Sequence, residues 1–349
     1  YPAVSPKSLW DVGALRDSGV DGIRIPVGFH LRMVARHMFN PVTDNFDPTG
    51  LTGYAWHKAP DGGACFAAPD GEWVYVSNCE SKSSGGVGAL RFAADGRIVD
   101  AYRILDGTRR NCAGGATPWG TWLSCEEVED GQVFECDPIN KTKASRALPA
   151  LGIFNHEAAA IHLSSRSVFL TEDASDGRLY RFVSDDAASR HRMDLTRGRL
   201  QVLSVEGREN GKYMPSHFTG AMAARWVEVP DPAVPQAKFR AASAARGRRA
   251  PGTAFRGPEG VWVHESLPAD LDGTRRASVF FSCKGENRIY ALDIDRLEIE
   301  SIFEGDDLDP PVREVDNLVV SPAGDLIVAE DGPAMRLVLV RLGGLAREL

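Results

Sequence analysis

The chain has 349 residues, 43% of them apolar and 25% charged, a balance typical of a globular protein with a sizeable core. Its formal net charge of −8 excludes the broad cationic surface that nucleic acid or an anionic membrane would require. No apolar run approaches the roughly 18 residues of a membrane-spanning segment. We therefore expect a single domain over residues 1–349, with residues 1–50 as an N-terminal lead-in.

One pattern recurs five times: a hydrophobic strand, then Ser, Thr or Ala, then one or two acids or cysteines and a polar turn. The copies are VYVSNCE (74–80), LSCEE (123–127), VFLTED (168–173), VFFSCK (279–284) and LIVAED (326–331). The steps from Glu80 to Glu127 and from Lys284 to Asp331 are both 47 positions. This period is that of a four-stranded blade. The sequence therefore predicts an all-β fold, a six-bladed β-propeller, with five or seven blades as alternatives.

The step from Asp173 to Lys284 is longer, at 111 positions. It has room for one further blade and for an inserted loop segment, which we place at residues 231–254. The run SAARGRR (243–249) within it is typical of a solvated surface loop.

The repeat has two series of equivalent positions, and acidic residues occupy the same position in at least four copies, with a cysteine or a lysine in others. One series follows the repeated strand, and a second series begins about 15 residues earlier, where the preceding strand should start. Singly, such acids are ordinary turn residues that face solvent. In a propeller, however, the inner strands converge on one axis, so these acids would repel one another unless protonated or bridged by cations. The sequence therefore predicts a central metal site, with the ligands Glu80, Cys112, Glu126, Glu127, Glu157, Glu172, Asp173, Glu259, Asp316 and Asp331.

Most of the six cysteines have no special context. Cys125 and Cys136 flank one predicted hairpin, and Cys65 and Cys79 flank another, so either pair consists of cross-strand neighbours or of ordinary buried residues. We expect most of them to be buried and unreactive. Cys112 differs because it precedes Ala-Gly-Gly at the position that acids occupy in the other repeats. Oxygen ligands suit calcium and a thiolate suits iron, so the mixture predicts more than one metal.

The stretch NCAGGATPWGTWLSCEE (111–127) resembles the PhoX family of bacterial alkaline phosphatases. The likeness extends more loosely over residues 50–332, through Asn155-His156-Glu157, the segment 171–182, Pro258-Glu259-Gly260 and Asp316-Asn317. The resemblance implies a six-bladed propeller with iron and calcium that hydrolyses phosphate monoesters after export, and so a periplasmic or secreted protein. It also implies that Cys112 binds iron and that the same cluster is shared by Glu127, Glu157, Glu172, Asp173 and Glu259.

Phosphate-ester hydrolysis also requires cationic groups for the phosphoryl oxygens. The candidates are Arg110, Arg256 and Lys284, of which Lys284 stands where other repeats have an acid. We expect the partner to be a small-molecule phosphate ester, with no nucleic acid and no membrane, and the protein to be a monomer.

Two other functions fit the same pattern. The stretch DNLVVSPAGDLIVAEDG (316–332) also suits a calcium-dependent lactonase or esterase of the gluconolactonase type. A non-catalytic propeller, stabilised by metal and binding other molecules at its rim, is the other alternative.

Overall fold

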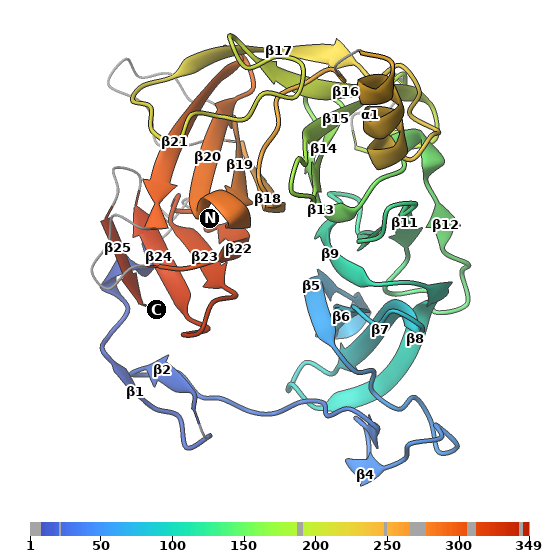
Figure 1. Ribbon diagram of the computed structural model, residues 1–349. Coiled ribbons are helices and arrows are strands. Elements are labelled where there is room, and N and C mark those ends of the chain that lie inside the picture. Colours follow the sequence, from blue (N-terminus) through green and yellow to red (C-terminus); the bar gives the residue numbers. More distant parts are fainter. Residues whose placement is uncertain are drawn as a thin grey trace.

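The computed structural model describes residues 8–20, 22–186, 191–247, 250–265, 277–305, 312–341 and 345–348. Nearly all regular structure is β-strand, as the sequence predicts. Five units of four antiparallel strands stand around a common centre, with the first strand of each unit innermost (Figure 1).

The strands of the five units follow one another in chain order. Unit I contains β5 (Pro60–Ala67), β6 (Trp73–Cys79), β7 (Gly85–Phe92) and β8 (Ile98–Thr108); unit II contains β9 (Asn111–Ala116), β10 (Trp122–Glu126), β11 (Val133–Cys136) and β12 (Arg146–Ala147); unit III contains β13 (His156–His162), β14 (Ser167–Glu172), β15 (Leu179–Ser184) and β16 (Gly198–Val205); unit IV contains β18 (Pro258–His264), β19 (Ser278–Cys283), β20 (Arg288–Asp293) and β21 (Glu298–Glu304); unit V contains β22 (Val315–Val320), β23 (Leu326–Glu330), β24 (Leu337–Arg341) and β25 (Leu345–Glu348). One further strand, β17 (Met222–Glu228), pairs with β16 and β21 and so joins units III and IV into one sheet.

The described residues thus form five four-stranded units, and the expected count of six blades is not confirmed. The long step between the third and fourth repeats contains β17 and one helix, α1 (Gln236–Ala245). This helix lies in the predicted insertion and packs beside unit III (Figure 1), where Arg240 forms ion pairs of 2.9 Å with both Glu172 and Asp176. Residues 244–247 are exposed, whereas Arg248 and Arg249 of the predicted surface loop lie outside the described residues. No described helix has the length and apolar character needed to cross a membrane.

Each repeated strand is apolar on both of its faces because each unit is packed between two neighbours. In β14, Val168 and Leu170 belong to one buried cluster, while Phe169 between them belongs to another. Successive side chains of a strand point to opposite faces, so this alternation packs the strand against both sides at once. The hydrophobic runs of the sequence repeat follow from this arrangement.

The lead-in connects the last unit to the first. At its start, the Ser8 hydroxyl and the Leu9 amide donate hydrogen bonds of 2.5 and 2.7 Å to the carboxylate of Asp325 in unit V. The chain then forms two short hairpins, β1 (Leu15–Asp17) with β2 (Arg24–Pro26) and β3 (Phe39–Asn40) with β4 (Asn45–Phe46). Just beyond the lead-in, Trp56 belongs to the same buried cluster as Leu90 of unit I.

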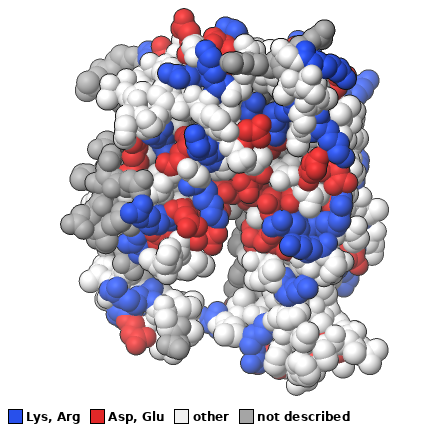
Figure 2. Space-filling view, in the orientation of Figure 1, with Lys and Arg blue, Asp and Glu red and all other residues white. Residues whose placement is uncertain are grey.

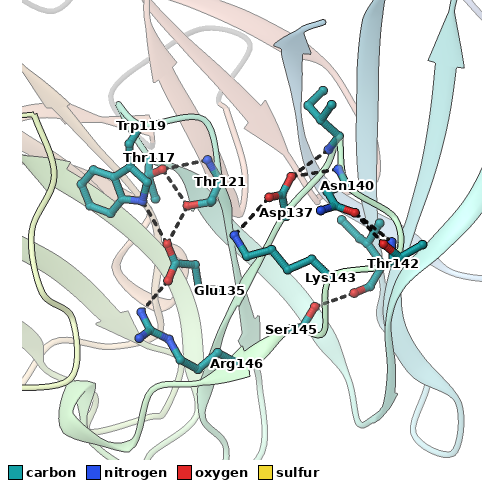
Figure 3. Close-up of polar contacts among 12 residues, drawn as sticks. Thr117, Trp119, Thr121, Glu135, Asp137, Asn140, Thr142, Lys143, Ser145 and Arg146 are labelled. Carbon is teal, nitrogen blue, oxygen red and sulfur yellow. Dashed lines mark hydrogen bonds and ion pairs between the residues drawn. The ribbon is translucent and has the colours of Figure 1, made fainter.

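Away from the centre, the buried acid Glu135 has its charge offset by several partners. Figure 3 shows Glu135 of β11, which accepts hydrogen bonds from Trp119 Nε1 and Thr121 Oγ1, both at 2.9 Å, and pairs with Arg146 at 2.7 Å. Burial alone would raise the pKa of Glu135, but these bonds outweigh burial and lower it.

Candidate metal centre

All five units carry the same irregularity at the start of the inner strand. In unit III, His156 pairs with Glu172 and Ala159 pairs with Leu170, so two residues, 157 and 158, stand opposite the single Thr171. The same arrangement of two residues against one occurs at 61–62, 112–113, 259–260 and 316–317. Such bulges re-aim side chains, and in each unit the first bulged residue lines the central cavity.

A backbone hydrogen bond that is repeated in all five units fixes the residue that follows the second strand. Its amide donates to the carbonyl of the residue before the inner strand, for example Glu127 N to Arg110 O at 2.9 Å and Lys284 N to Gly257 O at 2.8 Å. At Arg110 the backbone is left-handed, with φ 44°, and Ala59, Gly257 and Glu314 share this conformation at the equivalent position. The two series of residues are therefore held at one end of the ring of inner strands.

The two series meet in a cavity of about 570 Å³. From the bulges, it is lined by Asp61, Cys112, Glu157, Glu259 and Asp316, and from the second series by Glu80, Glu127, Asp173, Lys284 and Asp331. Figure 2 shows acidic side chains gathered around the hollow in the middle of this face. The convergence that the repeat predicts is thus present in the structure.

Two of the predicted ligands do not line this cavity. The Glu126 carboxylate accepts hydrogen bonds from the amides of Arg109 and Gln132, at 2.9 and 3.2 Å. The Glu172 carboxylate faces helix α1 and pairs with Arg240. In both cases the next residue along the chain, at 127 or 173, is the one that lines the cavity. The first acid of each pair therefore stabilises the fold, and the second is available for chemistry.

Donor atoms come close together in two overlapping groups. One group contains Cys112, Glu127 and Glu157, and the other contains Glu157, Glu259 and Asp316, with the donor atoms of each group within 4.8 Å of one another. Glu157 belongs to both groups and is 1% exposed. No lysine or arginine of the described part of the chain forms an ion pair with it.

Burial and mutual repulsion control the protonation of these groups. Burial raises the pKa of Glu157 well above its usual range, and the negative charges of Glu259 and Asp61 raise it further. Burial, followed by the charges of Asp173 and Asp316, raises the pKa of Glu259 to about 9. For Cys112, burial and then the charge of Glu157 raise the thiol pKa well above its ordinary value. Without cations, this cavity must hold protons at neutral pH.

These residues fit a bound metal, because the donor set combines carboxylate oxygens and one thiol with little compensating positive charge. Hard cations such as calcium prefer several oxygen ligands, which the Glu157, Glu259 and Asp316 group offers. The thiol in the other group suits a softer transition metal. Cys112 is the one half-buried cysteine; Cys79, Cys125, Cys136 and Cys283 are buried, Cys65 is exposed, and all six are free.

Two of the three predicted cationic residues reach the cavity. Arg110 pairs with Glu80 at 2.8 Å and with Glu127 at 3.3 Å. Lys284 pairs with Asp316 at 3.2 Å and also with Asp331.

Arg256 does not line the cavity. Its guanidinium carbon lies 4.4 Å from the ring centre of Tyr213, and its amide donates to the Glu286 carboxylate at 3.0 Å.

Asp61 is a cavity residue that the sequence pattern does not reveal. It occupies the bulge of unit I, and burial raises its pKa. The missing signal is spacing: Asp61 precedes Glu80 by 19 positions, whereas Cys112 precedes Glu127 by 15. The strand pairing of Pro60 with Cys79 shows that the positions are nonetheless equivalent.

The fold and site together define a β-propeller-like protein with an acidic central cavity suited to cations. The sequence model of the alkaline phosphatase PhoX family matches residues 84–133 and 128–288, more than half of the chain. The chain therefore belongs to the PhoX alkaline phosphatase family and is a hydrolase of phosphate esters. Members of this family depend on metals and are typically exported.

Solved structures with similar folds include Pseudomonas fluorescens PhoX in complex with vanadate, a transition state analogue. It is 17% identical, with a TM-score of 0.69, and the match covers 93% of this chain and 86% of that one. An auxiliary nutrient binding protein from Bacteroides thetaiotaomicron is 11% identical, with a TM-score of 0.47, covering 81% of this chain and 59% of that one. No protein with curated annotation matches the sequence. Family membership favours phosphate-ester hydrolysis over the lactonase and the non-catalytic propeller that the sequence also allowed.

Proposed function

We propose that the protein hydrolyses small phosphate monoesters in the central cavity, using iron and calcium held by the cavity acids and Cys112. The main support for the proposal is the environment of Glu157: this carboxylate is buried, and its close neighbours are a thiol and other acids. A buried charge of this kind is retained only if protons or cations offset it. A cavity built from such residues in five successive units is adapted to cations.

The donor groups suggest how the metals are divided. Iron would be held by Cys112 with Glu127 and Glu157, because its thiolate preference distinguishes it from calcium. Calcium would be held by Glu157, Glu259 and Asp316, with Asp61, Glu80, Asp173 and Asp331 as further oxygen donors around the same cavity. When bound, the cations supply Lewis-acid stabilisation of the charge that develops on the phosphoryl oxygens.

The protein's own cationic groups would orient the ester. Arg110 reaches the cavity from beside Glu80 and Glu127 of units I and II, while Lys284 pairs with Asp316 and Asp331 of unit V. They thus approach a bound phosphate from two sides. The guanidinium of Arg110 offers paired N–H donors, whereas Lys284 offers a compact charge. Both would donate to non-bridging phosphoryl oxygens.

The vanadate complex of the Pseudomonas fluorescens protein supports phosphate-ester hydrolysis, since vanadate, a transition state analogue, binds a protein of similar fold. We further propose that the protein acts after export, as a monomer, in the periplasm or outside the cell.

Metal analysis combined with activity assays tests the proposal. Protein purified without chelator should contain iron and calcium and should hydrolyse p-nitrophenyl phosphate, and chelator should abolish the activity. Cys112→Ser should lose iron, whereas Cys136→Ser, which alters a buried cysteine of the same unit, should keep it. Native protein that contains neither metal, or a Cys112→Ser variant with unchanged iron, would contradict the proposal.

A further inference from the structure

The repeat contains a small residue, a hydrogen-bonding Asn, Thr or Ser in three of the five units, that phosphate-ester chemistry does not explain. It stands opposite the bulge in each unit, at Asn78, Cys125, Thr171, Ser282 and Ala329. In three units its side chain reaches the inner strand of the next unit around the ring. A residue of one unit thus contacts the cavity residue of its neighbour.

Asn78 shows the contact most fully. Its amide nitrogen donates to the carbonyls of Cys112 and Ala113, at 2.9 and 2.7 Å, in the bulge of unit II. Its amide oxygen accepts from Trp122 Nε1 and Ser124 Oγ, both at 2.9 Å. Asn78 is fully buried, so all four bonds are made away from solvent. The amide therefore has a single orientation.

Thr171 and Ser282 make the same contact with hydroxyl groups. Thr171 Oγ1 donates to the carbonyl of Glu259 in unit IV and accepts from the amide of Ala158 at 3.1 Å. Ser282 Oγ donates to the carbonyl of Asp316 in unit V. Both side chains are fully buried.

A bulge interrupts the ladder of its own sheet, so its backbone groups need partners from elsewhere. The neighbouring unit supplies these partners at Cys112, Glu259 and Asp316. Because the carbonyl and the side chain share one Cα, fixing the carbonyl also restricts the direction of the side chain. The equivalent residue of unit V is Ala329, which has no side-chain donor.

We propose that Asn78, Thr171 and Ser282 are positioning residues, each of which holds the cavity residue of the next unit where it binds a cation. This role rests on the proposed function, since it presupposes that the cavity binds metal. On this proposal the contacts between units, rather than any one unit, set the distances between the donor atoms of the cavity. Loss of partners that orient metal ligands costs roughly 10- to 100-fold in metal affinity or activity.

Thr171→Val tests the proposal, because valine keeps the shape of threonine and removes the hydroxyl. Thr253 provides a matched control. It is also fully buried, and its hydroxyl accepts from the Val205 amide at 2.8 Å and donates to the Arg208 carbonyl at 3.0 Å, among residues that do not line the cavity. Both variants should lose similar thermal stability, since each leaves one amide and one carbonyl unpaired.

The two variants should differ in calcium binding. In calorimetric titrations of metal-free protein, Thr171→Val should bind calcium about 10-fold or more weakly than the wild type, and Thr253→Val should bind as the wild type does. Thr171→Ser, which restores a hydroxyl, should recover most of the affinity. Equal calcium affinity in Thr171→Val and the wild type would overturn the proposal, as would equal weakening in both valine variants.

Hydrogen exchange separates failure of this proposal from failure of the proposed function. In metal-free protein, peptides covering residues 255–265 should exchange faster in Thr171→Val than in Thr253→Val. Wild-type protein that binds no metal would refute the proposed function, and unchanged exchange in Thr171→Val would refute the positioning role itself.

A smaller substitution covers the case in which Thr171→Val fails to fold. Ser282→Ala should weaken calcium binding, whereas Ser184→Ala, at a buried serine whose hydroxyl donates to the Asp194 carbonyl at 2.7 Å, should not. Equal calcium affinity in the two alanine variants would count against the proposal.

Discussion

Glu135 and Glu157 are both buried carboxylates, 8% and 1% exposed, yet their surroundings are opposite. Glu135 accepts hydrogen bonds from Trp119 and Thr121 and pairs with Arg146 (Figure 3). A second arginine, Arg192, also pairs with it. Glu157 lies among other acids and a thiol. The pKa of Glu135 is lowered and that of Glu157 is raised.

The difference shows how to separate a structural acid from one kept for chemistry. Burial alone does not distinguish them, because both are removed from water. The partners do: a structural carboxylate has its charge offset by the protein, and a cavity carboxylate leaves its charge for a ligand to offset. Substitution of each residue should therefore affect different properties.

Glu157→Gln should give the largest effect on activity. Because Glu157 belongs to both donor groups, its loss should reduce metal binding and phosphatase activity by more than about 100-fold. This loss exceeds the one expected for a residue that only orients a metal ligand. The metal-free variant should be more stable than the metal-free wild type at neutral pH, since folding no longer has to protonate the Glu157 carboxylate, which is charged in the unfolded chain. Calorimetric titration and denaturant unfolding measure both.

Glu135→Gln is the matched control. It should lower the free energy of unfolding by about 2 kcal/mol, because hydrogen bonds to a charged group are weakened, and should leave metal affinity unchanged. If Glu157→Gln were to behave like Glu135→Gln, the distinction between the two acids would be wrong.

Lys284→Met should produce the next largest effect. Removing a cationic donor from the phosphate should lower kcat/KM for p-nitrophenyl phosphate by about 100-fold, with calcium still bound. Arg256→Ala should change kcat/KM by less than about 3-fold, because the Arg256 side chain packs on Tyr213 outside the cavity lining. Equal losses in the two variants would show that Arg256 also reaches the substrate.

The stability of the metal-free protein should depend on pH in an unusual direction. In the folded state, the pKa of Glu259 is raised to about 9 and that of Glu127 to about 7, from ordinary values of 4.5, with burial as the largest cause in both. At pH values between 4.5 and the raised pKa of each group, the folded state binds more protons than the unfolded state. The free energy of unfolding should therefore fall as the pH rises from about 5 to about 9.

Denaturant unfolding at several pH values, with chelator present, measures this slope. Saturating calcium should reduce or reverse it, because metal-bound carboxylates are already deprotonated in the folded state. A metal-free protein whose stability rises with pH over this range would contradict the raised pKa values.

The sequence predicts the strands and their convergence because both follow from a repeat with a fixed period. It does not predict which acid of an adjacent pair faces the cavity. Neighbouring residues of a strand point to opposite sides, so one member of Glu126-Glu127 had to turn away, but only the strand pairing shows which. Likewise Glu172 forms an ion pair with Arg240, which is 68 positions away in the sequence, so no local pattern indicates this partner.

Irregular spacing explains the other differences. Asp61 is missed because unit I has a longer connection before Glu80, so position counting places no acid there. Arg256 is close to Glu259 in sequence, yet a side chain three residues away need not share its direction. The contacts of Asn78 and Thr171 with the next unit depend on how the units pack, which the pattern within one unit does not contain.

Acids from five units meet in the central cavity, and we propose that they do so to bind cations. X-ray anomalous difference maps of protein crystallised without chelator test it most directly. We predict an iron peak bonded to the Cys112 sulfur and a separate calcium peak among the oxygens of Glu157, Glu259 and Asp316. A map with no anomalous peak in the cavity, and with only ordered water there, would contradict this proposal.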